Sequence, residues 1–269
     1  MHMAEGKAQG IDYSYLSFDT ATPEYSGRSL AELLDLAEEE GFAGLNITHP
    51  FKMEVPGLLH ELSPEAKILG AVNTVVFSNK KRSGYNTDYS GFRIAFNKQL
   101  ADASREHVLV LGSGGAGSAV ALALTDSGSR TLSVFDTYTE RAASLSERLS
   151  PVRPDVHIRV CESLGDQELS SIDGVVNATP MGMDKYPGVA IEVESLSPHT
   201  WVADVVYFPL ETELLRRAGA HGCRVMNGSG MAIYQAVEAF RLLTGLEPDP
   251  ERFTRNFHQL FAADQKKGE

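Results

Sequence analysis

Hydrophobic residues along this chain occur in two patterns. In some segments they recur every three to four residues, as in a helix, and in others they form short continuous runs, as in a buried strand. The two patterns together predict strands separated by helices. Leucines and alanines recur at helical spacing among acidic residues over 28–41, and the apolar run 44–48 follows as a short strand. We expect a second helix over 64–69, a β-branched strand over 71–77 and a third helix over 88–100.

The later part of the chain repeats the pattern of strand, helix and strand. The expected strands lie at 108–111, 132–136, 156–160, 174–177 and 201–206, and the expected C-terminal helices at 231–243 and 251–262. Alternation of this kind predicts a parallel sheet with helices on both faces, so the fold class is α/β.

The sequence contains no low-complexity linker, yet its length favours two domains. Residues 100–228 are expected to form a Rossmann-type, doubly wound domain. The flanking segments, 1–99 and 229–269, are each too short for a domain, so we expect them to pack together as a discontinuous α/β substrate domain. Ligands of open α/β sheets bind at the carboxyl ends of the strands, and a cleft facing that edge is the expected active site.

Composition argues against several classes of protein. The chain carries 24 Lys and Arg against 36 Asp and Glu, a net charge of −12 without a dense basic run, which argues against a nucleic-acid partner. Only Cys161 and Cys223 are present, so we expect no disulfide framework and a cytoplasmic location. Glycines and serines interrupt the most apolar stretch, 108–124, so no membrane span is expected. The eight histidines lack the spacing of metal ligands, and no metal is expected.

A glycine cluster follows the apolar strand at 108–111. It comprises Gly112, Gly114, Gly115 and Gly117, and a helical pattern begins directly after it. In such a turn the first glycine permits the tight bend, the second lets a pyrophosphate approach the backbone, and the last lets helix and strand pack closely. The helix N-terminus offers backbone N–H groups to the phosphates. The alternative is a glycine-rich turn that binds nothing.

Asp136 ends the next expected strand, after the apolar run that begins at 132. A carboxylate at this position accepts hydrogen bonds from both ribose hydroxyls of NAD and repels the 2′-phosphate of NADP. The glycine cluster and Asp136 together predict NAD as the cofactor.

Three polar clusters follow predicted strands in the first part of the chain. Thr48 and Lys52 belong to the first cluster, Asn73 to the second and Asp88 to the third. Such groups on neighbouring loops suit a substrate rich in hydroxyl groups, because each can hold a hydroxyl in one direction. The alternatives are a solvated surface lysine for Lys52 and a helix N-cap for Asp88.

These motifs and three later ones carry a resemblance to a known family. The chain resembles the shikimate dehydrogenase family, and most closely its NAD-using quinate/shikimate dehydrogenase branch. The matching segments run through the chain in the family's order: Asn46–Lys52, Ala71–Thr74, Asn86–Asp88, Gly112–Gly117, Asn177–Met183, Asp204–Tyr207 and Gly228–Gln235.

The resemblance implies roles for individual residues. Lys52 and Asp88 match the catalytic pair placed against the hydroxyl that is oxidised. The positions that match substrate contacts are Thr48, Asn73, Tyr207 and Gln235. Those that match cofactor contacts, besides the glycine cluster and Asp136, are Asn177, Thr179, Val205, Gly228 and Met231. For Met231 alone, core packing is the alternative.

The resemblance implies an NAD-dependent dehydrogenase that transfers a hydride between NAD and a small cyclic polyol carboxylate. The expected reactions interconvert shikimate and 3-dehydroshikimate, or quinate and 3-dehydroquinate, in aromatic amino acid biosynthesis or quinate catabolism. The expected assembly is a monomer or a homodimer. An aminoshikimate-type dehydrogenase and a non-catalytic NAD-binding protein are the two alternatives.

Two departures from the family pattern bear on specificity. The segment Asp136–Glu140 stands where many members carry an arginine suited to the phosphate of NADP, which again favours NAD. His49 stands where biosynthetic members often have valine, and here it resembles the quinate-using branch. Local packing or a supporting hydrogen bond is the alternative role of His49.

A third departure lies at the start of the chain. The family begins with a glycine-containing strand and a Ser-x-Ser/Thr-Pro-x-Met-His segment whose hydroxyls hold the substrate carboxylate. Met1-His2 matches only the end of that segment. We therefore expect the strand and both hydroxyl residues to be missing, either because the start codon was assigned too late, which we favour, or because this member is shortened.

Overall fold

The computed structural model describes residues 1–165 and 169–265, and the chain divides into two compact units. The first unit contains Met1–Thr87 and Ile233–Glu269, and the second contains Asp88–Ala232. A discontinuous unit built from the two flanking segments is therefore present. The expected boundaries at 99/100 and 228/229 differ from the observed ones mainly by helix α4 (Thr87–Gln99).

Helix α4 joins the second unit because its aromatic side chains are buried there. Phe96 packs edge-on against Trp201 with ring centroids 5.1 Å apart, and it is fully buried. The Tyr89 hydroxyl donates a hydrogen bond of 2.7 Å to Asp126 Oδ2. Contacts with residues distant in sequence thus decide the unit to which this helix belongs.

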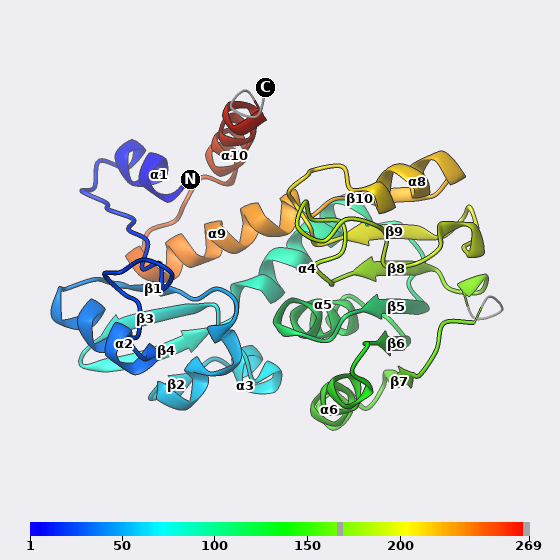
Figure 1. The fold of residues 1–269 in the computed structure, drawn as a ribbon, viewed down its shortest axis with the longest axis horizontal. Helices are drawn as coiled ribbons and strands as arrows, with labels where there is room; N and C mark the ends of the chain where they lie inside the picture. The colour runs from blue at the N-terminus through cyan, green and yellow to red at the C-terminus, as the bar shows by residue number, and fades with distance from the viewer. Residues whose placement is uncertain (166–168, 266–269) are drawn as a thin grey trace. The chain divides into compact units, whose positions relative to one another are not determined.

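The second unit is built on a six-stranded parallel sheet in the order β10-β9-β8-β5-β6-β7 (Figure 1). Its strands are β5 (His107–Leu111), β6 (Thr131–Phe135), β7 (His157–Cys161), β8 (Gly174–Asn177), β9 (Trp201–Asp204) and β10 (Arg224–Met226). Its other elements are α5 (Gly115–Asp126), α6 (Thr139–Leu149), η3 (Val193–Ser195) and α8 (Glu213–His221). This strand order is that of a Rossmann-type, doubly wound sheet, and the prediction of that fold is confirmed.

The central strands form because their residues are apolar on both faces, as parallel sheets covered by helices require. Every residue of β8 and β9 is buried, and so are four of the five residues of β5. Gly174 begins β8 where a Cβ atom would lie 2.0 Å from the ring of Trp201, so no larger residue fits beside that ring.

The first unit contains a four-stranded mixed sheet in the order β1-β3-β4-β2. The strands are β1 (Gly44–Asn46), β2 (Glu61–Leu62), β3 (Thr74–Ser78) and β4 (Lys81–Tyr85). Strand β3 pairs antiparallel with β1 and β4, and β2 pairs parallel with β4. Asn79 and Lys80 both have positive φ, as a tight two-residue turn between β3 and β4 requires.

Side-chain caps begin at least two helices of the first unit. The helices of this unit are α1 (His2–Ala8), α2 (Leu30–Glu39), η1 (Phe51–Met53), η2 (Val55–Leu58), α3 (Pro64–Leu69), the end of α9 (Ser229–Thr244) and α10 (Pro250–Gln265). Ser29 and Glu32 form a capping box at the start of α2. Ser63 caps α3, and Gly70 ends it in the left-handed region. Leu34, Val72 and Val75 join α2 and the strands in one buried cluster.

Several elements lie outside the sequence prediction. Helix α1, strands β2, β4 and β10 and helix α8 were not expected. Strand β4 reads Lys-Arg-Ser-Gly-Tyr, so its pairing with β3 rather than its hydrophobicity makes it a strand. Helix α8 has an amphipathic pattern, a Thr212 N-cap and a Gly222 C-cap, and these signals were available in the sequence.

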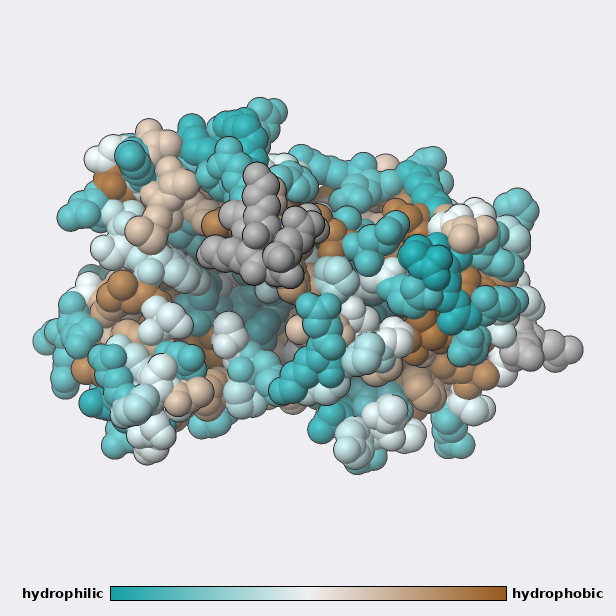
Figure 2. Space-filling model, turned by 45° about the horizontal axis from the view of Figure 1, so that its top comes forward, coloured by the Kyte–Doolittle hydropathy of each residue, from teal (hydrophilic) through white to brown (hydrophobic). Residues whose placement is uncertain are grey.

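Most of the surface in view is hydrophilic, and hydrophobic residues lie among it in small separate groups (Figure 2). Scattered groups of this kind are ordinary on soluble proteins. Among the described residues, no helix is long and apolar enough to cross a membrane.

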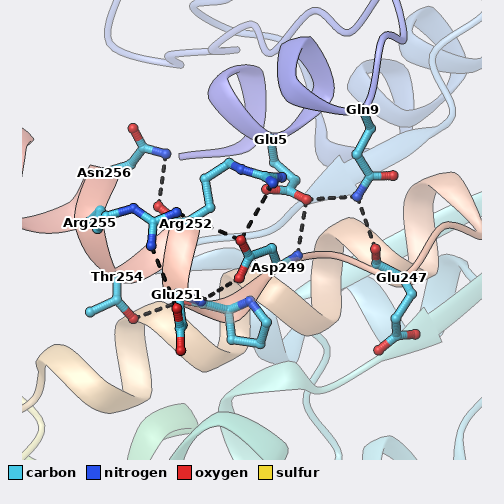
Figure 3. A network of polar contacts seen from close by, with 10 residues as sticks. Glu5, Gln9, Glu247, Asp249, Glu251, Arg252, Thr254, Arg255 and Asn256 are labelled. Atoms are coloured by element: carbon cyan, nitrogen blue, oxygen red, sulfur yellow. Dashed lines mark hydrogen bonds and ion pairs between the residues drawn. The ribbon is translucent and has the colours of Figure 1, made fainter.

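A buried carboxylate joins α1 to α10 within the first unit (Figure 3). The side chain of Glu5 is fully buried, and Arg252 Nη1 donates to its Oε2 at 2.7 Å. Gln9 Nε2 and the Asp249 backbone N–H donate to its Oε1 at 2.7 and 3.0 Å. Because a buried charge is costly unless it is paired, this contact anchors α1.

We expect Arg252→Met to lower the free energy of unfolding by about 2 kcal/mol, because it leaves the buried carboxylate of Glu5 without its cation. Urea denaturation followed by circular dichroism measures the change. Arg255→Met is the control, since Arg255 also lies on α10 but is exposed, and its ion pairs with described residues are 3.7 Å long. Equal losses in the two variants would contradict the role assigned to the Glu5 pair.

Candidate functional site

In the first unit, the ends of three strands meet at Asn73. The Asn73 backbone N–H donates to the Tyr85 carbonyl at 3.0 Å, and its carbonyl accepts from the Ile47 N–H at 2.8 Å. Asn73 therefore sits between the ends of β1 and β4, one residue before β3 begins. These backbone hydrogen bonds fix the position of the Asn73 Cα atom, from which the amide side chain extends.

The Asn73 amide is buried, with 4% of the residue exposed, and its hydrogen bonds define its orientation. Its Oδ1 accepts from the Thr87 backbone N–H at 2.7 Å and from Thr74 Oγ1 at 3.1 Å. Its Nδ2 donates to Thr87 Oγ1 at 3.0 Å. A backbone N–H can only donate, so the oxygen of the amide must face Thr87 N.

The network continues in both directions from Asn73. Asn46 Nδ2 donates to Thr74 Oγ1 at 3.1 Å, and the Tyr15 hydroxyl donates to Asn46 Oδ1 at 2.9 Å. At the other end, Thr87 Oγ1 donates to Gln235 Oε1 at 3.4 Å. The structure thus joins Asn73 and Gln235, two of the predicted substrate residues, through Thr87.

Lys52 and Thr48 lie on the loop that follows β1. Lys52 is half-buried in η1, and its backbone carbonyl accepts from the Val72 N–H at 2.8 Å. Thr48 is exposed, and its carbonyl accepts from the Phe51 N–H at 3.0 Å. The loop carrying Lys52 therefore runs beside the loop carrying Asn73, as the polar clusters predicted.

A cavity of about 820 Å³ lies in the first unit beside these residues. Its lining includes the segments 12–20 and 41–49, and Tyr15, Asn46, Thr48 and His49 are among its residues. Tyr15 and Asn46, at one end of the network, thus line the cavity. Asn73 and Thr74 are buried and do not line it.

Asp88 directly follows Thr87 and lies in the first turn of α4, where it is 6% exposed. Because α4 begins at Thr87, Asp88 is inside the helix rather than before it. Asp88 belongs to the second unit and Lys52 to the first.

In the second unit, the glycine cluster has the geometry predicted for it. Gly112 has a φ of 91°, in the left-handed region that favours glycine. A Cβ atom at Gly117 would lie 2.0 Å from the Gly112 carbonyl oxygen, so helix α5 could not pack so closely with any other residue. At Gly114, the N-cap of α5, a Cβ atom would meet nothing within 4 Å.

Asp136 follows β6 and holds the glycine loop. Its Oδ2 accepts from the backbone N–H and the hydroxyl of Ser113, each at 2.8 Å, and its Oδ1 accepts from the Tyr138 N–H at 3.0 Å. Partial burial acts to raise the pKa of Asp136, but these hydrogen bonds outweigh it and the pKa lies below its ordinary value.

A second carboxylate, Asp204, joins the ends of β8 and β9. Its Oδ1 accepts from Asn177 Nδ2 at 3.0 Å and the Val206 N–H at 2.9 Å, and its Oδ2 accepts from Thr212 Oγ1 at 2.7 Å. Asn177 Oδ1 in turn accepts from Thr179 Oγ1 at 2.6 Å. Burial raises the pKa of Asp204 to about 6 against the effect of these hydrogen bonds.

The remaining predicted cofactor residues of the second unit lie near the same strand ends. A Cβ atom at Gly228 would lie 2.3 Å from the Val205 carbonyl oxygen, so the backbones at these two positions are in close contact. Met231 is 7% exposed in the first turn of α9, and Tyr207, a predicted substrate residue, is 49% exposed.

Seven side chains of these networks were not among the sequence candidates, and three of them are Tyr15, Asn46 and Thr212. The other four are Thr74, Thr87, Ser113 and Asp204. Thr74 looks like an ordinary β-branched strand residue, and Thr87 stands between two residues of a quoted motif, so neither is conspicuous in the sequence. Among the residues that the structure describes, no group of three or more His, Cys, Asp or Glu side chains is placed to hold a metal ion.

Similarity to known proteins decides the family. The family model described as "Shikimate dehydrogenase substrate binding domain" matches residues 1–75, and "Shikimate 5'-dehydrogenase C-terminal domain" matches residues 228–255. The chain is 49% identical over 262 residues to the quinate/shikimate dehydrogenase (NAD(+)) of Corynebacterium efficiens, which covers 97% of this chain and 92% of that protein. The chain belongs to the shikimate dehydrogenase family.

Other members of the shikimate dehydrogenase family are similar over the whole chain. The shikimate dehydrogenase (NADP(+)) of Pseudarthrobacter chlorophenolicus is 46% identical over 98% of this chain and 91% of its own length. The solved structure of quinate dehydrogenase from Corynebacterium glutamicum in complex with NAD has a TM-score of 0.90 and 46% identity, covering 96% of this chain and 92% of its own. Membership makes this chain an oxidoreductase.

The raised pKa of Asp204 predicts a pH dependence of stability. Between pH 4 and pH 6 the unfolded chain loses this proton while the native chain keeps it, so the contribution of Asp204 to stability falls as the pH rises through this window. We expect the free energy of unfolding of the wild type, relative to Asp204→Asn, to fall by about 2 to 3 kcal/mol between pH 4 and pH 7.

Chemical denaturation of both proteins at several pH values measures this difference. Asp184→Asn, at an exposed position of the same unit, is the control for a change of charge alone. A difference between wild type and Asp204→Asn that stays constant with pH would contradict the raised pKa.

Proposed function

We propose that this member of the family is an NAD-dependent dehydrogenase of shikimate, quinate or a closely related cyclic polyol carboxylate. The observation that carries the proposal is the buried network that joins Asn73, Thr87 and Gln235 beside the loop of Lys52. Polar side chains held in fixed directions suit a ring that carries several hydroxyl groups. A protein that only binds NAD has no need of them.

Lys52 and Asp88 are the proposed catalytic pair. Oxidation of a secondary alcohol requires that a proton leave the hydroxyl oxygen, and a neutral amine at Lys52 would accept it. In the reductive direction, the ammonium form of Lys52 would donate a proton to the oxygen as charge develops there. Asp88 is the residue proposed to hold the reacting hydroxyl.

Thr48, Asn73, Tyr207 and Gln235 are the proposed substrate contacts. The orientation of the Asn73 amide is set by a backbone N–H and two threonine hydroxyls. Thr48 and Tyr207 are both exposed, so each side chain is accessible to a ligand.

The residues of the second unit fit NAD. The open space at Gly114, the uncapped start of α5 and the positive φ of Gly112 suit a pyrophosphate, and the carboxylate of Asp136 suits a ribose with free hydroxyls. Asn177, Thr179, Val205, Gly228 and Met231, with Gly115 and Gly117, complete the proposed cofactor set. NAD bound by these residues would supply the acceptor for the hydride that leaves the substrate carbon.

We propose the cytoplasm as the location and a monomer or homodimer as the assembly. Cys161 and Cys223 are buried and unlinked by a disulfide, which suits a reducing compartment.

Lys52→Ala tests the catalytic role. We expect kcat to fall by about 100-fold or more, because general acid–base catalysis contributes on that scale, while the Kd for NAD changes little. Formation of NADH from shikimate and from quinate measures turnover, and calorimetric titration measures NAD binding. Lys67→Ala, at an exposed position on α3, is the matched control. Near-normal turnover of Lys52→Ala would exclude the assignment.

The role of Asp136 is tested by the preference of the enzyme for NAD over NADP. We expect kcat/KM with NAD to exceed that with NADP by roughly 100-fold, because like charges brought together at a binding site cost several kcal/mol. Asp136→Ser should narrow this ratio, whereas Glu140→Gln, in the first turn of α6, is the control for loss of a nearby charge. Comparable efficiency of the wild type with both cofactors would refute NAD selectivity.

The same assay separates the proposal from its alternatives. Turnover confined to aminoquinate or aminoshikimate would favour the aminoshikimate-type enzyme. A wild-type protein that binds NAD but turns over shikimate, quinate and aminoquinate at no measurable rate would favour the binding protein.

A further inference from the structure

We propose that Thr74 is a positioning residue for the amide of Asn73, acting within a one-directional chain of hydrogen bonds that runs from Tyr15 to Gln235. The inference rests on the proposed role of Asn73 as a substrate contact. Thr74 is 0% exposed, so it does not contact a ligand itself. Its hydroxyl bonds the Asn73 amide, and it therefore acts on a ligand through Asn73.

The direction of the chain at Thr74 follows from counting protons. A threonine hydroxyl has one hydrogen to donate and two lone pairs with which to accept. Thr74 Oγ1 donates its hydrogen to Asn73 Oδ1 at 3.1 Å. It accepts from Asn46 Nδ2, also at 3.1 Å, and Asn46 Oδ1 accepts from the Tyr15 hydroxyl.

The direction beyond Asn73 is set by the Thr87 backbone. Because Thr87 N–H donates to Asn73 Oδ1 at 2.7 Å, the Nδ2 group of Asn73 must lie on the other side of the amide, where it donates to Thr87 Oγ1. Thr87 Oγ1 lies 3.2 Å from Asn73 Oδ1 and 3.4 Å from Gln235 Oε1. The two lone pairs of Asn73 Oδ1 already accept from the Thr87 N–H and from Thr74 Oγ1, so the single hydroxyl hydrogen of Thr87 is donated to Gln235 Oε1. Any contact that Gln235 makes through Nε2 it makes as a donor.

Because its middle is buried, we expect the hydrogen bonds in the middle of this hydrogen-bond chain to affect substrate binding more than the hydrogen bond at its Tyr15 end. Thr74, Thr87 and Asn73 are 0%, 1% and 4% exposed, and a hydrogen bond lost in such surroundings is not replaced by bulk water. Tyr15 is 45% exposed and borders the cavity, where water can take over its bond to Asn46. We therefore expect loss of the Thr74 hydroxyl to matter and loss of the Tyr15 hydroxyl to matter little.

Without the Thr74 hydroxyl, two groups lose a partner at once. Asn73 Oδ1 loses one of its donors, and Asn46 Nδ2 loses its acceptor. The terminal torsion of an asparagine side chain has broad wells, so the amide of Asn73 would then sample a wider range of angles. A wider range weakens binding of the substrate and leaves binding of NAD unchanged.

Thr74→Val and Thr74→Ser separate the hydroxyl from the shape of the side chain. We expect Thr74→Val to raise KM for the substrate about tenfold, with kcat within about threefold of wild type and an unchanged Kd for NAD. Thr74→Ser restores the hydroxyl and should bring KM to within about twofold of wild type. Tyr15→Phe should change KM by less than about threefold.

Thr244→Val is the matched control, because Thr244 lies in the same unit and, among the described residues, its hydroxyl bonds only backbone groups near the end of α9: it donates to the Phe240 carbonyl at 2.7 Å and accepts from the Leu246 N–H at 3.1 Å. Its KM should equal that of the wild type. In an Asn73→Ala background, Thr74→Val should have no further effect on KM, since the residue through which it acts is gone.

An unchanged KM in Thr74→Val would overturn the inference, and so would an equal rise in Thr74→Ser. If Thr74→Val does not fold, Thr74→Cys replaces it, because a thiol is a weak donor. KM of Thr74→Cys should exceed that of Thr74→Ser at least threefold, and equality overturns the inference.

Failure of the proposed function can be distinguished from failure of the inference on Thr74. A wild type that turns over neither shikimate nor quinate overturns the dehydrogenase proposal, and the role of Thr74 falls with it. A wild type that does turn one over, with a KM that Asn73→Ala leaves unchanged, overturns only the assignment of Asn73 and of its positioning residue.

Discussion

Burial of the Asn73 amide is the constraint on which the first unit depends. A buried amide group without hydrogen bonds costs about 1–3 kcal/mol for each unmet group. The structure meets this requirement with the ends of β1, β3 and β4 and the start of α4. Because the same strand ends lead into the loop of Lys52, the bonds that satisfy one amide also gather the polar groups proposed to bind and convert the substrate.

The second unit uses carboxylates where the first uses amides. Asp136 joins the ends of β5 and β6 through Ser113, and Asp204 joins the ends of β8 and β9 through Asn177. Partly exposed Asp136 stays readily ionised, whereas burial outweighs the hydrogen bonds at Asp204. One carboxylate is thereby suited to meet a ligand, and the other to hold two strand ends together.

Sequence reasoning reached most of the fold because the pattern of apolar runs is regular where strands are central, as in β5 and β8. It missed β4, whose polar residues become a strand only through pairing with β3, and it assigned α4 to the other unit because the packing of Phe96 on Trp201 is not local. In the candidate site, glycine spacing identified the turn. No spacing identifies Thr74, since its role depends on where its single hydroxyl hydrogen points.

Because α1 and α10 are in contact through Glu5 and Arg252, we expect the two helices to unfold together. An isolated helix of seven residues is too short to persist in water, so α1 depends on its contacts with the rest of the unit, among them those of Glu5 with α10 and of His2 with Phe253. Unfolding of α10 removes Arg252 and releases α1 with it, although more than two hundred residues separate them in the sequence. The backbone amides of both helices should therefore exchange with solvent deuterium as one cooperative unit.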